Sequence, residues 1–529
     1  MSEKEIIEQG LTSIGIEFGS TRIKTVMVDM NGKPLAQGSH TWENQYENGV
    51  WTYSLDMIWD GLADSYADLA KNVEKEFGVA ITKVKSIGFS AMMHGYMAFN
   101  EAGDLLVPFR TWRNTITEEA ASVLTKEFGF NIPQRWSIAH LYQAILNGED
   151  HVGDISFFTT LAGYIHWQLT GEKVLGIGDA SGMFPIDSTT RDYNKDYLAK
   201  FDKLIDGKGF GWKLEDILPK VLVAGDAAGT LTEEGVKKLD KSGKLQAGVL
   251  VCPPEGDAGT GMVATNSVAI RTGNVSAGTS IFAMIVMEKA LNKVHEEVDV
   301  VTTPVGDDVA MVHCNNCTSD INAWAKLFKE YSEAMGFEVD MDKLYTTMFS
   351  SAMKGAPDCG GLMGFNYFSG EPVTGFEEGR PVFIRKPDAD FSFANFMRLH
   401  LFSAVSTLKY GLDILFREEN VAVDKMYGHG GFFKTKDAGQ RIMSAAIGEP
   451  VTVMATAGEG GAWGIALLAL YAVRYDKDKT LADFLQNDIF GGEEGESVMA
   501  DKAEIDGMNA FMDAFKKSMP VERAAVESF

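Results

Sequence analysis

The chain has 529 residues, 45% of them hydrophobic, and a formal net charge of −26 at pH 7. This length exceeds one ordinary hydrophobic core and predicts two domains. The acidic balance argues against a nucleic-acid partner, which requires a basic face, and against docking on anionic lipid. The most apolar stretch, Ala462 to Val473, is too short to span a bilayer, and the first residues lack a signal-peptide pattern. We therefore expect a cytoplasmic protein with no membrane partner.

The chain opens with alternating apolar residues and turn signals. A strand over Ser13 to Phe18 is followed by a glycine turn and by a second strand over Ile23 to Asp29. Asn31-Gly32 indicates a hairpin leading to a third strand over Leu35 to Thr41. The following pattern predicts a helix over Leu55 to Phe77, a strand over Val84 to Ser90, and helices over Glu118 to Glu127, Ala139 to Leu146 and Thr160 to Leu169.

A second run of the same type begins near residue 267. Strands are predicted over Val268 to Thr272 and Ile281 to Met287, with Gly273-Asn274 as a turn. Because the segment before Ile281 repeats the first glycine turn, we expect similar α/β domains over 12–266 and 267–490, and an acidic, then helical, tail over 491–529. The second domain is further expected to contain a strand over Lys425 to Gly428, a helix capped by Thr435 and ending near Ile447, a strand over Pro450 to Met454 and a small-residue helix over Glu459 to Val473.

The four cysteines offer no strong metal pattern. Cys314 and Cys317 form a single CxxC, and Cys252 and Cys359 lack the spacing of a second pair. We expect reduced, structural thiols.

Two glycine turns have the character of phosphate sites. Gly19-Ser20-Thr21 and Gly278-Thr279-Ser280 each stand between two strands, where backbone N–H groups and hydroxyls can surround an anion. Glu17 precedes the first turn and could hold Mg²⁺. The alternative is a plain hairpin with polar turn residues.

A carboxylate stands among small residues after an apolar run. Asp257, within Pro253 to Gly259, follows Val249 to Val251 and is placed to accept a proton from a sugar hydroxyl. An Asp that stabilises a turn is an equally consistent interpretation.

The end of the strand near Ser90 carries groups that suit a sugar. His94 could hydrogen-bond a hydroxyl while Met93 packs on the ring, and Trp112 and Asn114 add an aromatic face and a donor. Each also has a structural interpretation, as a core histidine or a half-buried loop tryptophan. Gly428-His429-Gly430-Gly431 before a helix could admit a nucleotide or form an ordinary turn.

Taken in order, these motifs resemble the FGGY family of carbohydrate kinases, over roughly Ile14 to Tyr471. Ile14 to Thr21 is similar to the family's opening phosphate loop, Gly256-Asp257-Ala258 to its catalytic loop, and Glu459 to Ala466 to its closing helix. The resemblance implies an α/β fold of two RNase H-like domains, of the actin and Hsp70 ATPase type, flanking a deep catalytic cleft. It implies ATP and Mg²⁺ as cofactors and a small sugar as substrate.

The resemblance also assigns roles. Asp257 would be the catalytic base, and Glu17 with Asp257 would hold the metal. Met93, His94, Trp112, Asn114 and Asp257 would bind the sugar. The nucleotide would contact Gly19, Ser20, Thr21 and Lys24 in the first domain, and Gly278, Thr279, Ser280, Gly430, Gly431 and Phe432 in the second.

Within the family, Met92-Met93-His94-Gly95 resembles the sugar loop QMHG of xylulokinases, which implies D-xylulose as acceptor. The chain departs from the family at several positions: Glu17 replaces an Asp, Met92 a Gln and Leu161 a common Lys, and Trp112-Arg113-Asn114 stands for WND. These departures leave other acceptors open, such as ribulose or glycerol. An actin- or Hsp70-like ATPase and a binding regulator without turnover are the alternatives of other classes. The assembly state is open, with a homodimer as one candidate.

Overall fold

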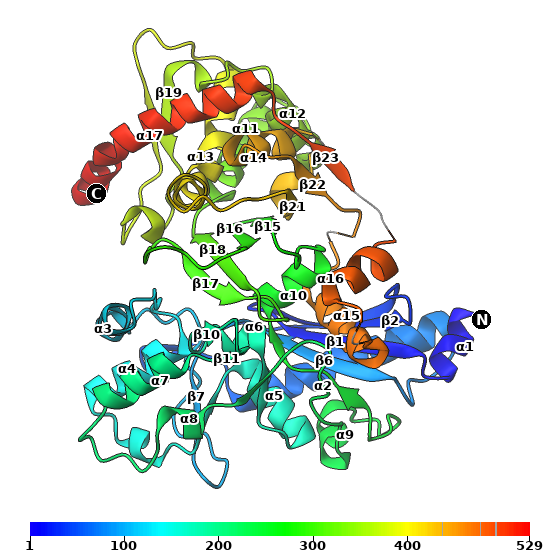
Figure 1. Cartoon of the computed structure of the whole chain (residues 1–529). Helices are drawn as coiled ribbons and strands as arrows, with labels where there is room; N and C mark the ends of the chain where they lie inside the picture. Colours follow the sequence, from blue (N-terminus) through cyan, green and yellow to red (C-terminus); the bar gives the residue numbers. More distant parts are fainter. Residues whose placement is uncertain (436, 457, 477, 492–494) are drawn as a thin grey trace. The chain divides into compact units, whose positions relative to one another are not determined.

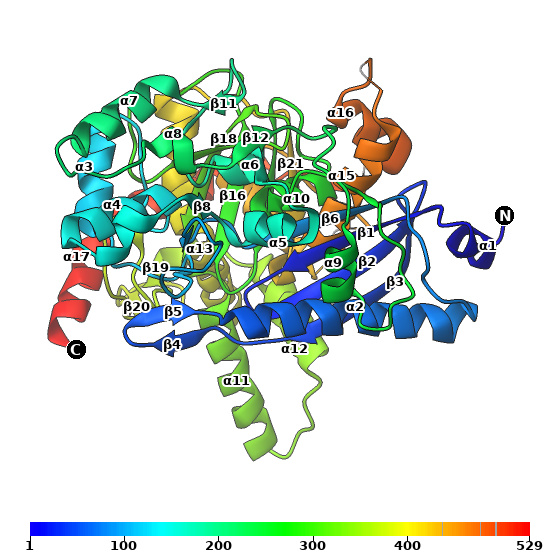
Figure 2. The ribbon, with the colours of Figure 1, turned by 90° about the horizontal axis from the view of Figure 1, so that it is seen from below.

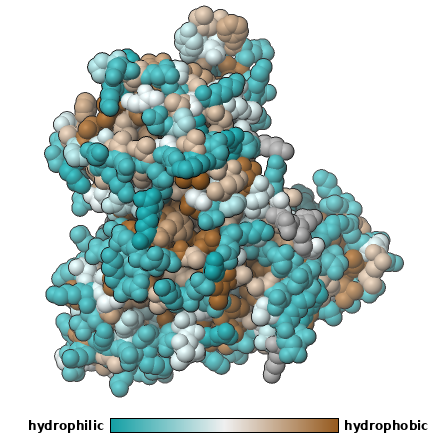
Figure 3. All heavy atoms as spheres, turned by 45° about the horizontal axis from the view of Figure 1, so that its top comes forward, coloured by the Kyte–Doolittle hydropathy of each residue, from teal (hydrophilic) through white to brown (hydrophobic). Residues whose placement is uncertain are grey.

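The computed structural model describes residues 1–435, 437–456, 458–476, 478–491 and 495–529 (Figure 1). The chain forms two compact units, each built from separate segments. Unit 1 comprises residues 1–268, 300–309 and 459–492, and unit 2 comprises 269–299, 310–458 and 493–529. Among the described residues, none of the helices combines the length and the apolarity needed to cross a bilayer. Hydrophilic atoms cover most of the face shown in Figure 3.

The central sheet of unit 1 has the strand order β13-β6-β1-β2-β3, with β14 pairing to β6. Strands β1, β2 and β3 form an antiparallel meander, and β6 pairs in parallel with β1. The predicted opening of strand, glycine turn, strand, hairpin, strand is thereby confirmed. The strands are β1 Thr12–Phe18, β2 Arg22–Asp29, β3 Pro34–Thr41, β6 Ser86–Ala91, β13 Leu250–Val251 and β14 Glu255–Gly256.

Helix α2 (Leu55–Phe77) covers the meander and lies along β2 and β3 (Figure 2). Ser54 caps its first turn by accepting from the Met57 N–H, and Gly78 ends it in the left-handed conformation. Its apolar face carries Ile58, Leu62, Tyr66, Leu69 and Val73 into the core of unit 1. Because this face repeats every three to four residues, the sequence alone defined both ends of the helix.

Helix α15 (Gly461–Arg474) packs on β1 and β6 in unit 1. The sequence prediction placed this segment in the second domain, whereas its contacts group it with unit 1. The packing is close because Gly15 on β1 has no side chain: a Cβ there would lie 2.1 Å from the carbonyl oxygen of Ala462. The chain therefore returns to the first sheet after completing most of the second, which a linear domain division misses.

The second sheet, most of whose strands belong to unit 2, repeats the same arrangement in the order β17-β18-β16-β15-β21-β22-β23. Strands β15 and β16 are antiparallel, and β21 pairs in parallel with β15. The predicted fold class of two RNase H-like α/β domains is thus confirmed. The strands are β15 Thr272–Ala277, β16 Ile281–Val286, β17 Asp299–Thr302, β18 Asp308–Cys314, β21 Lys425–His429, β22 Val451–Val453 and β23 Glu496–Val498.

The start of the second sheet differs from the prediction. The strand expected over residues 268–272 is a turn, in which the Thr272 N–H donates to the Ala269 carbonyl and Arg271 has φ 64°. The expected turn at Gly273-Asn274 lies inside β15 instead. Here the apolar run was misleading because Ile270 is 52% exposed rather than part of a strand's buried face.

The helical part of the predicted tail is α17, which packs on α14 in unit 2, and β23 of the tail pairs with β22. Residues 492–494 of the tail lie outside the described residues. One prediction in this unit is wrong. Helix α14 begins after Asp437, so Thr435 is not its cap, and Lys436 lies outside the described residues. The longer helices are α11 Ser319–Ala334, α12 Met341–Ala352, α13 Phe393–Asp413, α14 Ala438–Ile447 and α17 Lys502–Ser528.

All four cysteines are free and buried, in agreement with the expectation of structural thiols. Burial raises the pKa of the Cys314 thiol well above its usual value, which keeps the thiol protonated and unreactive.

Candidate active site

The first glycine turn joins β1 to β2 and is braced from behind by two aromatic residues. Trp42 Nε1 donates to the Gly19 carbonyl at 2.7 Å, and the Tyr53 hydroxyl donates to the Ser20 carbonyl at 2.6 Å. Gly19 and Ser20 are half-buried, and Thr21 is exposed. The turn is therefore held in one shape while Thr21 remains accessible to a ligand.

The predicted base, Asp257, is the first residue of α10 (Asp257–Ala264), directly after β14. Its Oδ1 accepts a hydrogen bond from the Met93 N–H at 3.2 Å, which ties the carboxylate to the loop after β6. Desolvation of the carboxyl group by the surrounding protein atoms raises the pKa of Asp257. The residue nevertheless stays exposed to solvent, as a group that must meet a substrate has to be.

Glu17, near the end of β1, faces the start of α15. A Cβ on Gly461 would lie 1.7 Å from Glu17 Oε2, so the glycine leaves the space into which the glutamate extends. Oε2 is buried and has no hydrogen-bond partner among the described residues. Burial, and secondly the charge of Asp257, raise the pKa of Glu17 to about 8.

Lys24 pairs across the strands with Glu17, and its Nζ donates to the Glu459 carbonyl at 2.8 Å. It thereby holds the loop that leads into α15. Its positive charge opposes the increase in the Glu17 pKa, as the least of the three influences on that group.

The Glu17 and Asp257 carboxylates fit a magnesium ion. They interact electrostatically, and Glu17 Oε2 is an orphaned buried oxygen. In the described part of the chain, no group of three or more His, Cys, Asp or Glu side chains is arranged to hold a metal. Such a sparse set suits Mg²⁺, which usually takes one or two protein carboxylates and completes its shell with phosphate oxygens and water.

Two more carboxylates lie beside Asp257, and the sequence analysis gave neither a role. Glu255 accepts the N–H groups of Gly178 and Asp179 at 3.2 and 3.0 Å, at the short helix α6 (Ile177–Ala180). Burial raises the pKa of Glu255 to about 8 and that of Asp179 to about 7. The signal for Glu255 was its place directly before Gly256-Asp257, in a segment otherwise free of charge.

The predicted sugar loop follows β6. Met93 and His94 are 6% and 5% exposed, and His94 has φ 67°, a left-handed conformation that side-chain-bearing residues rarely adopt. His94 Nδ1 hydrogen-bonds the Gly182 carbonyl at 3.0 Å, and its ring stacks on Trp136 with a centroid distance of 6.0 Å. Backbone strain of this kind is concentrated at functional sites.

The loop that carries Trp112 and Asn114 differs from the prediction at Asn114. Trp112 Nε1 donates to Ser20 Oγ at 3.3 Å and so links this loop to the first glycine turn. Asn114 is 2% exposed, and its amide makes three hydrogen bonds of 2.9 Å to the backbone of Trp51 and Thr111. Both donors of Asn114 are therefore used internally, and the residue positions the loop rather than a sugar.

The second glycine turn, in unit 2, is braced by the segment before α11. The Gly278 carbonyl accepts from the backbone N–H and the hydroxyl of Thr318, and the Thr279 carbonyl accepts from the Cys317 N–H. Thr279 itself is exposed, and Gly278 and Ser280 are half-buried. The two turns thus occupy the same position in the two sheets, between the first and second strands of each meander.

The third predicted nucleotide motif, also in unit 2, follows β21. Gly430 and Gly431 are exposed, whereas Phe432 is fully buried and packs on Phe349 and Phe433. The structure thus places the Phe432 ring in the core of unit 2, and its contact with a nucleotide stays a prediction. The glycines remain candidates.

The family models decide what this arrangement belongs to. The N-terminal domain of the FGGY family of carbohydrate kinases matches residues 12–258, and the C-terminal domain of that family matches residues 273–473. This chain belongs to the FGGY family of carbohydrate kinases. FGGY kinases use ATP, so the chain is an ATP-dependent carbohydrate kinase.

Distant relatives of this FGGY kinase bear different names. A xylulose kinase of Haemophilus influenzae is 22% identical over 475 residues, which cover 87% of this chain and 90% of that one. Two solved structures share the fold: gluconate kinase from Lactobacillus acidophilus, with TM-score 0.77, 16% identity and coverage of 96% and 97%, and Plasmodium falciparum glycerol kinase with ADP, with TM-score 0.74, 13% identity and coverage of 97% and 98%. At such identities the likeness to the two structures shows the fold alone.

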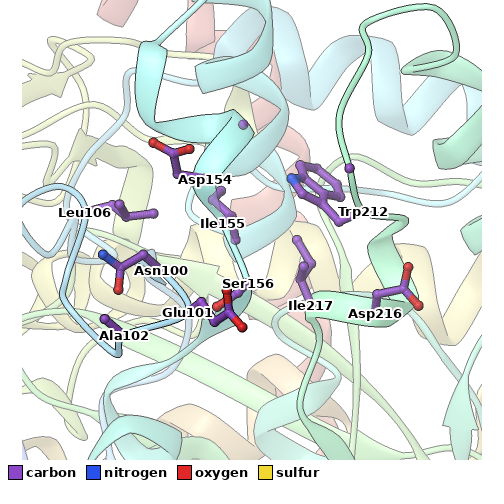
Figure 4. Close-up of a pocket in the computed structure, with 12 residues that line it drawn as sticks. Asn100, Glu101, Ala102, Leu106, Asp154, Ile155, Ser156, Trp212, Asp216 and Ile217 are labelled. Carbon is purple, nitrogen blue, oxygen red and sulfur yellow. The ribbon is translucent and has the colours of Figure 1, made fainter.

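The FGGY kinase also has an open surface pocket of about 910 Å³ in unit 1, apart from the residues above. Its lining combines the apolar side chains of Ile155, Trp212 and Ile217 with the carboxylates of Asp154 and Asp216 (Figure 4). None of the predicted site residues lines it.

Proposed function

We propose that the carbohydrate phosphorylated by this kinase is a ketopentose, with D-xylulose, giving D-xylulose 5-phosphate, as the leading candidate. The observation that carries the proposal is the hydrogen bond between the Met93 N–H and Asp257 Oδ1. It joins the loop that resembles a xylulokinase sugar loop to the carboxylate expected to act as base. A curated relative named xylulose kinase, matched over most of its length, supports the same acceptor.

In this proposal Asp257 accepts the proton of the attacking hydroxyl. The Met93 N–H fixes one of its oxygens, and the solvent exposure of the residue leaves room for a substrate. Proton acceptance by a positioned carboxylate is one part of catalysis, and alignment of the two reactants supplies most of the rest.

ATP would contact the two glycine turns, at Ser20-Thr21 in unit 1 and Gly278-Thr279 in unit 2. Glu17 and Asp257 would hold Mg²⁺, which when bound neutralises charge on the transferring phosphoryl group. Lys24 keeps the start of α15 in place beside Glu17 through its hydrogen bond to Glu459. The proposal gives this chain's own residues the tasks of orientation and proton acceptance.

A coupled assay of ADP release tests the proposal. A panel of D-xylulose, ribulose, glycerol, gluconate and no sugar separates a ketopentose kinase from the other acceptors and from a sugar-independent ATPase. We expect the highest kcat/KM with D-xylulose. Equal ADP release with and without sugar would contradict the proposal, and a preference for another acceptor would reassign the substrate.

The Asp257→Asn variant tests the base. It should lower kcat by roughly 10²–10⁴, the usual range for loss of a general base, while ATP binding persists. Asp60→Asn, at an exposed position on α2, serves as the control and should leave kcat unchanged. Near-normal turnover in Asp257→Asn would remove this residue from the base role.

A further inference from the structure

Asp179 has a carboxylate oxygen that this chain does not satisfy. The residue is 1% exposed, and its Oδ2 accepts from the Thr160 hydroxyl at 2.7 Å. The other oxygen, Oδ1, is buried and has no hydrogen-bond partner among the described residues. A buried polar atom without a partner costs free energy, so natural structures retain few of them.

The position of this oxygen relates it to the base. A Cβ built on Gly256 would lie 2.2 Å from Met93 Cγ and 3.1 Å from Asp179 Oδ1. Asp179 and the sugar-loop methionine therefore meet at the residue directly before Asp257. The charge of Asp257 also contributes to the increase in the Asp179 pKa, as a smaller influence than burial.

Trp136 provides an unsatisfied donor beside the sugar loop. It precedes α4 (Ser137–Asn147), is fully buried and stacks on His94 with a centroid distance of 6.0 Å. Its Nε1–H has no acceptor among the described residues. His94 is hydrogen-bonded to the carbonyl of Gly182, which lies just after α6, and the Gly182 N–H donates to the carbonyl of Asp179.

We propose that Asp179 and Trp136 are further sugar-binding residues, an acceptor and a donor that two hydroxyls of the carbohydrate satisfy. This rests on the proposed function, because it places the sugar between Asp257 and the Met93-His94 loop. Neither residue was among the substrate contacts that the sequence suggested.

The test is a cycle between variants and deoxy substrates. Asp179→Asn removes the charge, and Trp136→Phe removes the Nε1–H while keeping a ring to stack on His94. Each should raise the KM for the best sugar about 10-fold or more, in line with loss of a hydrogen bond to a buried site, and leave the KM for ATP within about twofold. Thr160→Val, which removes the Oδ2 contact of Asp179 together with the hydrogen bond that Thr160 accepts from the Gly163 N–H at the start of α5 (Leu161–Thr170), is the control for orientation and should have the smaller effect.

Hydroxyl-specific pairing provides the decisive readout. For one deoxy analogue, the KM with the wild type should exceed the KM for the full sugar, whereas with Asp179→Asn the two KM values should be equal. A different deoxy analogue should show the same equality with Trp136→Phe. Unchanged sugar KM values, or equal penalties for every analogue in wild type and variants, would overturn the assignment. A wild type that releases no ADP in response to any sugar would overturn both this inference and the proposed function.

Discussion

Gly461→Ala tests whether the glycine at the start of α15 makes room for Glu17. The added Cβ would lie 1.7 Å from Glu17 Oε2, inside the roughly 3 Å that such contacts require, so the carboxylate has to move by about 1.3 Å. No positive φ is involved, so alanine is compatible with the backbone, and the clash falls on side chains: chiefly on Glu17 and, at 2.8 Å, on Thr260 Oγ1.

A displacement of about 1 Å in a catalytic site costs on the order of 10² in rate. We therefore expect Gly461→Ala to lower kcat by about 10- to 100-fold. We also expect the rate of the variant to respond less to the Mg²⁺ concentration than the rate of the wild type does. The assay is sugar-dependent ADP release at varied Mg²⁺, with thermal unfolding measured in parallel. Gly261→Ala is the matched control, because it lies on α10 and a Cβ there meets nothing within 4 Å.

A second substitution distinguishes a specific clash from general damage. Glu17→Asp shortens the side chain by one methylene and should restore much of the activity when combined with Gly461→Ala, since the two changes act on the same contact. Wild-type kcat in Gly461→Ala, or a double variant no better than the worse single one, would refute the reasoning. The pairing would also explain why glutamate is tolerated where the family has aspartate.

Two further predictions concern unit 2. Glu371 is buried, accepts from the backbone N–H groups of Asn315 and Asn316, and has a pKa raised to about 7 by burial. Because its pKa in the folded protein exceeds that in the unfolded chain, ionisation of Glu371 lowers the free energy of unfolding as the pH rises between the two values. Between pH 5 and pH 8, the free energy of unfolding of Glu371→Gln should therefore rise by about 2–3 kcal/mol relative to that of the wild type, as measured by denaturant titration. A difference that does not change with pH would contradict this prediction. Phe432→Ala should lower the free energy of unfolding by about 3–5 kcal/mol, as for other buried aromatic residues, while the protein that remains folded keeps its KM for ATP. Weakened ATP binding at unchanged stability would instead show that Phe432 contributes to the nucleotide site.

Local patterns in the sequence were sufficient for the opening meander and for the two glycine turns, but they misplaced the first strand of the second sheet and did not indicate β17, β18 or β23. The meander of β1, β2 and β3 and the ends of α2 follow from alternation, from Asn31-Gly32 and from the caps Ser54 and Gly78, all of which act over a few residues. The order of the motifs along the chain was enough to indicate the family. It also nominated Asp257 as the base, which the carboxylate alone could not do, because an Asp that stabilises a turn fits the same local pattern.

The tertiary structure decided which side chains share a space. Only folding brings Gly461 against Glu17 and places Asp179 beside Gly256, contacts between residues far apart in the chain. It also sends Phe432 into the core and uses the amide of Asn114 for the backbone, although both looked like ligand contacts in the sequence. Burial and hydrogen-bond satisfaction depend on all neighbours at once, so a local pattern can nominate a polar or aromatic residue but cannot say whether a ligand or the protein itself will be its partner.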